Sequence, residues 1–167
     1  MIEHVTGEEV RRLFYYEPST GWLIRRVSTG GRSQAGNIVG CKNSVGYLVV
    51  RIDNRLYLVH RLVWLYHFNV VPAALDHMDG YKSNNKIKNL RPCTRFENLR
   101  NRGPNKNNTS GYKGAFFNKL QNKWYAKIQV NGRQKNLGYF NTPEEAHIAY
   151  CEAARHHHGK FFNSGAK

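Results

Sequence analysis

Hydrophobic and polar positions in the first half of the chain predict short helices and strands. Thr6-Gly-Glu-Glu9 is typical of a capping box, and Val10, Leu13 and Phe14 follow it with helical spacing. Asp53-Asn54 separates two apolar runs and favours a two-residue hairpin turn. A short amphipathic helix is expected after this hairpin, over residues 60–68. The predicted strands of this half are residues 22–27, 47–52 and 55–59.

The last third of the chain has a clearer pattern. Asn131-Gly132, the dipeptide that most favours a tight hairpin, separates two of three predicted strands. Thr142-Pro-Glu-Glu145 combines an N-cap, an early proline and acidic residues, which predicts a helix start, and Gly159 predicts its end. The three strands are expected at residues 112–117, 124–130 and 133–140. This part therefore reads as a small module of three strands and one helix.

Composition and charge narrow the class of protein. The chain has 167 residues, with 26 Lys and Arg against 11 Asp and Glu, so its formal net charge is +15. Such a charge favours a polyanionic partner, while 13% aromatic residues exclude a disordered basic tail. No apolar run is long enough for a membrane span, and the N-terminus does not read as a signal peptide. Three cysteines without a CxxC spacing favour a reducing, cytoplasmic setting.

Acidic residues are unevenly distributed, which predicts a division of the chain. No Asp or Glu occurs between Glu97 and Glu144, and within that stretch the polar segment 102–111 reads as a linker. We therefore expect one domain over residues 1–104 and another over residues 105–167. A basic run without acidic partners favours phosphate contact over a merely solubilising surface.

The middle of the chain carries the candidate chemistry. Asp76-His77 precedes the turn signal Asp79-Gly80, and Thr94-Arg-Phe-Glu97 fits a capping box that would place Asn98 in the first turn of a helix. Hydrolysis of DNA needs a base for water and a hard cation for the phosphate oxygens. Asp76 and Asn98 offer the oxygen ligands that Mg²⁺ prefers. Because neighbouring strand residues point to opposite faces, we expect a bend at Asp76-His77.

These residues resemble those of an HNH endonuclease of the phage or homing type, with a ββα-metal site. The resemblance rests on Val59-His-Arg-Leu-Val-Trp64, Asp76-His-Met-Asp-Gly80, Asn84-Asn-Lys-Ile-Lys-Asn-Leu-Arg91 and Glu97-Asn98. It implies that His77 is the general base and that Asp76 and Asn98 are metal ligands. It also implies that Asn89 braces the loop and helps to orient His77, and that His60 has a structural role. The implied cofactor is one divalent ion, Mg²⁺ with Mn²⁺ as a substitute, and the implied products carry 5′-phosphate and 3′-hydroxyl ends.

A second resemblance covers the C-terminal part. Gly111-Tyr-Lys-Gly114, Trp124-Tyr-Ala-Lys-Ile128, Leu137-Gly-Tyr-Phe140 and Thr142-Pro-Glu-Glu-Ala-His-Ile-Ala-Tyr150 are similar to an AP2 DNA-binding domain. The expected fold class is therefore α+β, a ββα-metal nuclease region followed by an AP2-like sheet and helix. Phe116, Asn118, Gln129 and Asn136 depart from the arginines and tryptophans with which plant members read DNA. The target sequence of those members is therefore not expected here.

The predicted function is that of a metal-dependent endonuclease acting on double-stranded DNA. It is expected to act as a monomer, in the bacterial or phage-infected cytoplasm.

 The alternatives are a non-catalytic DNA-binding regulator, which intact Asp76, His77 and Asn98 speak against, and an RNA-binding protein suggested by charge alone. The expected DNA-contacting residues are Lys82, Lys86, Arg91, Arg95, Arg100, Arg102, Lys113, Lys119, Lys127, Gln129, Arg133 and Lys135.

Several residues near these motifs have a structural interpretation. Asn84 and Asn85 are expected to hold a polar loop through side-chain-to-backbone hydrogen bonds. The run His156–His158 is expected at a solvated helix end. Trp22, Trp64 and Trp124 are expected in the core.

Overall fold

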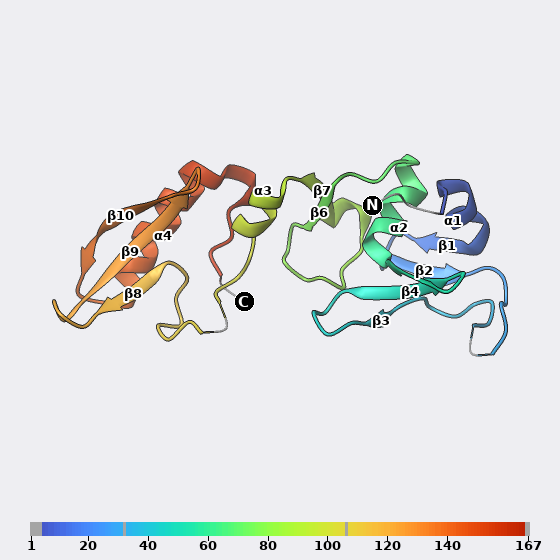
Figure 1. Cartoon of the computed structure of the whole chain (residues 1–167), viewed down its shortest axis with the longest axis horizontal. Helices are drawn as coiled ribbons and strands as arrows, with labels where there is room; N and C mark the ends of the chain where they lie inside the picture. The colour runs from blue at the N-terminus through green and yellow to red at the C-terminus, as the bar shows by residue number, and fades with distance from the viewer. Residues whose placement is uncertain (1–4, 32, 106, 166–167) are drawn as a thin grey trace. The chain divides into compact units, whose positions relative to one another are not determined.

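The computed structural model describes residues 5–31, 33–105 and 107–165. The chain forms two compact units, Met1–Thr94 and Arg95–Lys167, and each is described by itself (Figure 1). Both units mix helices with small antiparallel sheets, as the α+β prediction expects. The predicted nuclease domain over residues 1–104 and DNA-binding domain over residues 105–167 stay predictions. Among the helices in the described ranges, none combines the length and apolar character needed to cross a bilayer.

The first unit is built from two helices, a three-stranded sheet and two hairpins. Helix α1 begins after Thr6, whose side chain accepts a hydrogen bond from the backbone N–H of Glu9 at 3.1 Å, so the predicted N-cap is confirmed. The hairpin turn at Asp53-Asn54 is also confirmed, with positive φ at both residues. The elements are α1 (Gly7–Leu13), β1 (Phe14–Glu17), β2 (Trp22–Arg25), β3 (Cys41–Lys42), β4 (Leu48–Ile52), β5 (Arg55–Leu58), α2 (Val59–Phe68), β6 (Ala74–His77), the 3₁₀ turn η1 (Ile87–Asn89) and β7 (Leu90–Cys93).

The core of this unit lies where α1 and α2 pack together with the β1–β2 hairpin. Val10, Phe14, Leu23 and Leu62 are completely buried there. Burying side chains of this size stabilises the fold by roughly 1.5–3 kcal/mol each. The prediction that Trp22 lies in the core is wrong: its side chain is 44% exposed, because Leu23, its neighbour on β2, occupies the inward-facing position.

The second unit is a helix, a three-stranded antiparallel sheet and a long helix packed on that sheet (Figure 1). The predicted hairpin turn at Asn131-Gly132 is confirmed, with φ of 49° and 81°. The capping box at Thr142 is also confirmed, because Thr142 and Glu145 each accept a hydrogen bond from the other's backbone N–H. The elements are α3 (Arg95–Arg100), β8 (Ala115–Asn118), β9 (Lys123–Val130), β10 (Arg133–Phe140), α4 (Pro143–His158) and the 3₁₀ turn η2 (Gly159–Phe161).

Ala126 and Ile128 on β9 face α4 and are buried against Ala146, Tyr150 and Ala154. Trp124 is partly buried against the same cluster. The prediction of a wholly solvated histidine run at the end of α4 is wrong in part. His158 is buried, and burial lowers its pKa, whereas His156 is exposed.

Candidate active site

The β6–β7 hairpin places the Asp76-His77 pair. Strand pairing sets Asp76 opposite Arg91 and His77 opposite Leu90. Both members of the pair are buried, each only 4% exposed. The strand stays extended through His77, and the chain turns directly afterwards, where Gly80 N–H donates to His77 O at 2.9 Å. A bend was expected at Asp76-His77, but the backbone turns only after His77.

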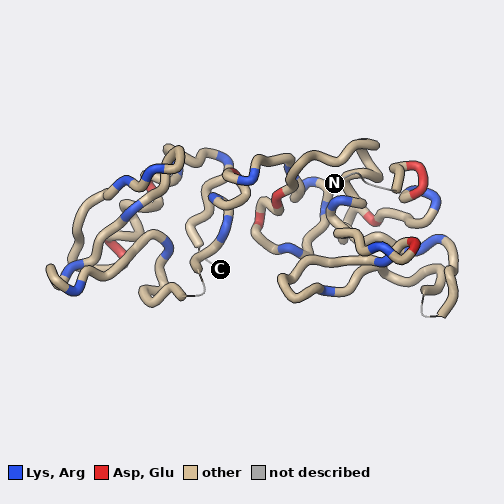
Figure 2. Tube along the Cα trace, in the orientation of Figure 1, with Lys and Arg blue, Asp and Glu red and all other residues tan. Residues whose placement is uncertain are grey.

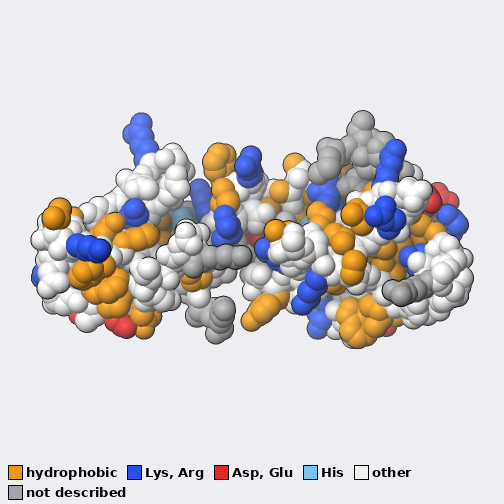
Figure 3. All heavy atoms as spheres, turned by 60° about the horizontal axis from the view of Figure 1, so that its bottom comes forward, with side chains coloured by type: hydrophobic (Ala, Val, Ile, Leu, Met, Phe, Trp, Pro, Cys, Tyr) orange, Lys and Arg blue, Asp and Glu red, His pale blue; other side chains and the backbone are white. Residues whose placement is uncertain are grey.

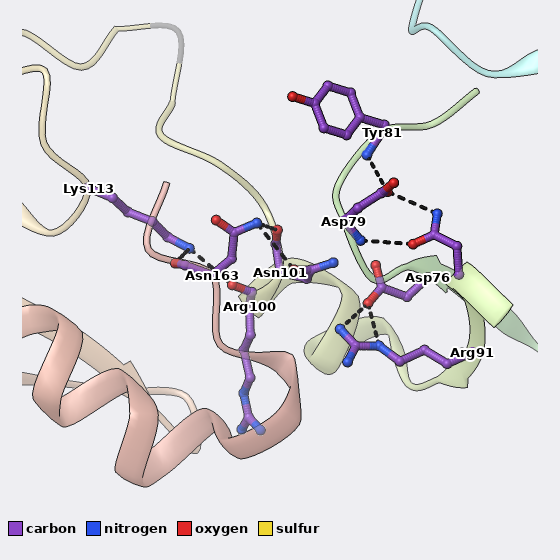
Figure 4. A network of polar contacts seen from close by, with 9 residues as sticks. Asp76, Asp79, Tyr81, Arg91, Arg100, Asn101, Lys113 and Asn163 are labelled. Atoms are coloured by element: carbon purple, nitrogen blue, oxygen red, sulfur yellow. Dashed lines mark hydrogen bonds and ion pairs between the residues drawn. The ribbon is translucent and has the colours of Figure 1, made fainter. Parts of the chain in front are cut away.

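Asp76 forms an ion pair across the hairpin. Arg91 donates from Nε at 2.8 Å and from Nη2 at 2.6 Å, both to Oδ2 of Asp76 (Figure 4). Directly opposed residues of an antiparallel pair lie within side-chain reach, which explains why this arginine meets this carboxylate. A buried carboxylate requires such a partner, and Arg91 supplies a charge-assisted one.

The loop between the two strands is held by a network around Asp79 and Asn89. Asp79 N–H donates to Asn89 Oδ1 at 3.1 Å, and Asn89 Nδ2 donates back to Asp79 Oδ1 at 2.9 Å. Asn89 Nδ2 also donates to Asn84 O at 2.9 Å, and Asn84 Nδ2 donates to the Asp79 carboxylate. The backbone N–H of Tyr81 donates to the same carboxylate (Figure 4). Asn89 thus makes hydrogen bonds to both side chains and backbone of the loop. Bracing this loop is one of the two roles that the motif implies for Asn89, and the other, orienting His77, stays a prediction.

The side chain of Asn85 contacts the imidazole of His77. Oδ1 of Asn85 lies 3.0 Å from His77 Nε2, and Asn85 is only 1% exposed. Asn85 was expected to hold the loop through side-chain-to-backbone hydrogen bonds, whereas this contact joins its side chain to that of His77. Two other rings line the imidazole: His60 meets it edge-on at 5.0 Å between centroids, and Tyr47 lies at 5.9 Å.

These surroundings determine the chemical state of His77. Burial lowers its pKa below the usual value near 6.5, although the Asn85 hydrogen bond and the carboxylates of Asp79 and Asp76 act in the opposite direction. The ring is therefore neutral at pH 7. Because a carboxamide oxygen only accepts, Nε2 carries the proton and the lone pair lies on Nδ1. This is the form of histidine that can take a proton from water.

The same stretch offers oxygen ligands for a hard cation. Asp76 contributes a carboxylate, of which both Arg91 hydrogen bonds use the single oxygen Oδ2. Carboxylate oxygens are among the ligands that hard divalent cations prefer in proteins. Across residues 5–31, 33–105 and 107–165, no three His, Cys, Asp or Glu side chains are grouped as a metal site.

Asn98, the second expected ligand, lies half-buried on α3 in the second unit. Helix α3 begins at Arg95, directly after the predicted capping residue Thr94. Its C-terminal end is tied to the tail of the chain, because Asn163 Nδ2 donates to Asn101 O at 2.8 Å (Figure 4). The role of Asn98 rests on the sequence motif.

Lys113, an expected DNA contact, lies within the second unit. Its ammonium donates to Arg100 O at 3.1 Å and to Asn163 O at 2.9 Å (Figure 4). Burial lowers its pKa to about 8. In this structure Lys113 therefore joins α3, the start of the sheet and the C-terminal tail.

The outer face of the second-unit sheet, opposite α4, carries aromatic and basic side chains. Phe116, Tyr125 and Tyr139 form a row across the three strands, with ring centroids 5.5 Å and 6.1 Å apart. Lys127 Nζ lies 4.6 Å from the Phe116 centroid. Figure 3 shows hydrophobic side chains with Lys and Arg among them on this unit.

The remaining expected DNA contacts are distributed over both units. In the first unit, Lys82 is exposed and donates to Val45 O at 2.9 Å, and Lys86 is exposed beside Asn85. In the second unit, Arg100 and Lys127 are half-buried, whereas the others are exposed: Arg95, Arg102, Lys119, Gln129, Arg133 and Lys135.

Two contributors to the site could not be found from the sequence pattern. Asn85 and Asn84 look alike in sequence, and only the fold of the loop shows which one turns inward. Tyr16 accepts a hydrogen bond from Ile87 N–H at 2.8 Å across 71 positions of sequence, a separation that no local motif reveals. Arg91 was expected from the sequence as a DNA contact, but its pairing with Asp76 was not, since that pairing depends on the β6–β7 register.

Comparison with known proteins defines the class to which this site belongs. Residues 57–100 match the family model described as HNH endonuclease, and this stretch contains the Asp76-His77 pair, Asn85, Asn89 and Arg91. The chain is also similar to Protein 3.8 of Escherichia phage T7, with 32% identity over 104 residues, which is 61% of this chain and 85% of that relative. Residues 57–100 therefore form an HNH endonuclease family domain, and the chain belongs to the same family as Protein 3.8. No solved structure matches the chain at a significant level.

Proposed function

We propose that this protein is a metal-dependent endonuclease that hydrolyses phosphodiester bonds in double-stranded DNA. The observation that carries the proposal is His77, a buried and neutral imidazole whose Nε2 is held by Asn85 within the family motif. The relative from a phage supports action in the cytoplasm of an infected bacterium. Action as a monomer is part of the proposal, because two linked DNA-binding units raise affinity without a second copy.

In the proposed mechanism His77 is the general base. Its Nδ1 lone pair takes a proton from the water that attacks the phosphorus atom. The Asn85 contact at Nε2 fixes the tautomer and the plane of the ring, so the lone pair is held in one direction. Asn89 acts one step further away, by bracing the loop that carries Asn85.

Asp76 and Asn98 would hold the divalent cation, Mg²⁺ or Mn²⁺. The ion supplies charge stabilisation for the phosphate and the leaving oxygen. Arg91 orients the Asp76 carboxylate through Oδ2 and adds a fixed positive charge beside the site. The sequence motif is the basis for giving Asn98 this role, and Asn98 lies on α3, the helix that follows β7 in the chain.

The second unit would bind duplex DNA and keep the nuclease on its substrate, as the likeness to an AP2 domain implies. Basic side chains occur along this unit, and no acidic residue occurs from position 98 to 143 (Figure 2). Contacts of this kind with phosphates position a protein on DNA without specifying a sequence. Lys119, Lys127, Arg133 and Lys135 are the residues proposed to make them.

A plasmid assay tests the catalytic proposal. Supercoiled DNA is incubated with wild type, His77→Ala or His156→Ala in Mg²⁺, Mn²⁺ or EDTA. His156 is the matched control, because it is exposed on α4 in the other unit. We expect relaxed or linear product from wild type and His156→Ala with either metal, and at least a hundredfold less from His77→Ala, the lower end of the loss for a missing general base.

DNA binding by the same proteins separates the alternatives. His77→Ala is expected to bind duplex DNA with nearly the affinity of wild type. Tight binding by wild type without cleavage in any metal would support the regulator instead. Better competition by structured RNA than by duplex DNA would support the RNA-binding alternative.

A further inference from the structure

The N-terminal hairpin β1–β2 contacts the loop that carries Asn85, although it lies outside residues 57–100, which match the family. Tyr16 on β1 is 4% exposed, and its hydroxyl oxygen accepts the backbone N–H of Ile87 at 2.8 Å. The Tyr16 ring packs edge-on against His67 of α2, with centroids 4.6 Å apart. The packing of the ring against His67 fixes the position of the Tyr16 hydroxyl, whose oxygen accepts the hydrogen bond from the loop.

The turn of the same hairpin touches the loop at a second point. Gly21 has φ of +79°, and a Cβ built on it would lie 2.6 Å from the carbonyl carbon of Asn85 and 2.9 Å from Cα of Lys86. No real Cβ approaches backbone atoms so closely, so only glycine allows this contact. The hairpin turn thus packs directly on the peptide bond that follows Asn85.

These two contacts lie at and directly after Asn85, the residue whose side chain is hydrogen-bonded to the candidate base His77. Gly21 contacts the backbone at Asn85 and Lys86, and Tyr16 holds the backbone at Ile87. We propose that the β1–β2 hairpin is a positioning element of the active site, in which Gly21 and Tyr16 fix the Asn85 backbone so that its amide oxygen meets His77 Nε2. This inference rests on the proposed function, since it explains how the base of that reaction is oriented.

The physical reason is that the position of the Asn85 backbone sets the direction in which its side chain meets the imidazole. The hydrogen bonds of Asp79, Asn84 and Asn89 join these three residues to one another, whereas Gly21 and Tyr16 contact the backbone around Asn85 itself. A displacement of the Asn85 peptide by about 1 Å would lengthen the 3.0 Å contact beyond a hydrogen bond. Losing a partner that orients a catalytic ligand or base typically lowers activity by about 10–100-fold.

The test compares two glycines that share a backbone conformation. Gly21→Ala adds a methyl group against the loop, whereas Gly36→Ala, at φ of +85°, adds one where no atom lies within 4 Å. Both variants carry the strain of a positive φ, so their difference isolates the contact with the loop. A second pair, Tyr16→Phe and the exposed Tyr15→Phe, removes one hydroxyl each from the same strand.

Two measurements are made on each full-length variant: the ¹⁵N shifts of the His77 ring, and kcat and KM for plasmid cleavage. Wild type, Gly36→Ala and Tyr15→Phe are expected to show the tautomer with its proton on Nε2. Gly21→Ala is expected to show a mixture of tautomers and a kcat about 10–100-fold lower with KM little changed. Tyr16→Phe is expected to shift both in the same direction, with faster exchange of the Ile87 amide hydrogen.

The outcomes are separable. A wild-type tautomer in folded Gly21→Ala and Tyr16→Phe would overturn the positioning role, as would an equal effect of Gly36→Ala. If Gly21→Ala does not fold, the Tyr16→Phe and Tyr15→Phe pair decides. If wild type cleaves no DNA, the proposed function fails, while the ring shifts still show whether the hairpin orients His77.

Discussion

At the scale of single residues, His60 shows the strongest effect of burial on a titrating group. It is 5% exposed, packs against His77 and Tyr47, and its Nδ1 has no hydrogen-bond partner in the structure as described. Burial first, then the neighbouring His77 and Arg61, lowers its pKa to about 3. The folded protein therefore keeps the His60 imidazole neutral.

This pKa predicts how stability depends on pH. Above pH 6.5 His60 is neutral in both the folded and the unfolded chain, so it has no effect on the pH dependence. As the pH falls from 6.5 towards 3, the unfolded chain binds a proton that the folded chain does not, and stability is lost. At pH 5 the loss is about 2 kcal/mol, since one pKa unit corresponds to about 1.4 kcal/mol.

Replacing His60 by phenylalanine tests this prediction. His60→Phe keeps an aromatic ring against Tyr47 and His77 but cannot bind a proton. We expect its free energy of unfolding, measured with urea at pH 7.5 and pH 5, to fall less than that of wild type, by about 2 kcal/mol. His67→Phe, at an exposed histidine of α2, serves as the control. Equal pH dependence in His60→Phe and wild type would contradict the assignment.

The residues of the candidate site could be predicted where a motif fixes their spacing in the sequence. They could not be predicted where the fold of a loop decides which side chain points inward. The sequence singles out Asp76, His77 and Asn89, and the structure places all three in one hairpin and its loop. It does not single out Asn85, because the inward direction of that side chain depends on contacts with Gly21 and Tyr16, far away in sequence.

At the scale of elements, turns and caps were the most predictable features. Both tight hairpins carry residues that tolerate positive φ, at Asp53-Asn54 and Asn131-Gly132, and both form. The short strands were harder, because four residues give few positions for a clear alternation: β2, β5 and β8 were predicted, whereas β1, β6 and β7, of the same length, were not. Their pairing, rather than their own sequence, defines them.

The cap of α4 provides a test at this scale. Thr142 accepts a hydrogen bond from Glu145 N–H at 3.2 Å, and Glu145 Oε2 accepts the N–H of Thr142 in return. Thr142→Ala is expected to lower the free energy of unfolding by about 1 kcal/mol, the usual effect of removing such a cap. Thermal denaturation measures the change, with Thr109→Ala, at an exposed threonine that caps no helix, as the control. Equal melting temperatures for the two variants would show that the cap does not stabilise α4.

At the scale of the whole molecule, charge is the property that links the two units to one partner. A formal charge of +15 on a chain of this length draws DNA towards any surface of the protein, so charge alone does not identify the binding face. Specific phosphate contacts differ from a general field in one measurable respect. Each contact releases counterions, so the logarithm of the binding constant falls with the logarithm of the salt concentration by about 0.9 per contact.

Two variants with the same net charge separate these effects. One replaces Lys119, Lys127, Arg133 and Lys135 of the second unit by glutamine, and the other replaces the exposed Arg12, Lys42, Arg51 and Arg55 of the first unit. Each lowers the formal charge by four, from +15 to +11. If the second-unit residues contact phosphates, the first variant is expected to lose roughly three to four units of salt slope and the second less than about one.

Binding of catalytically inactive His77→Ala protein to a short duplex, measured from low to moderate salt, gives both slopes without cleavage of the probe. Equal slopes in the two charge variants would mean that DNA responds only to net charge, and the second unit would then not be a DNA-binding module. A lower slope confined to the first-unit variant would move the DNA contacts to the unit that carries His77. A lower slope confined to the second-unit variant would show that the protein binds DNA with one unit and carries its candidate base on the other.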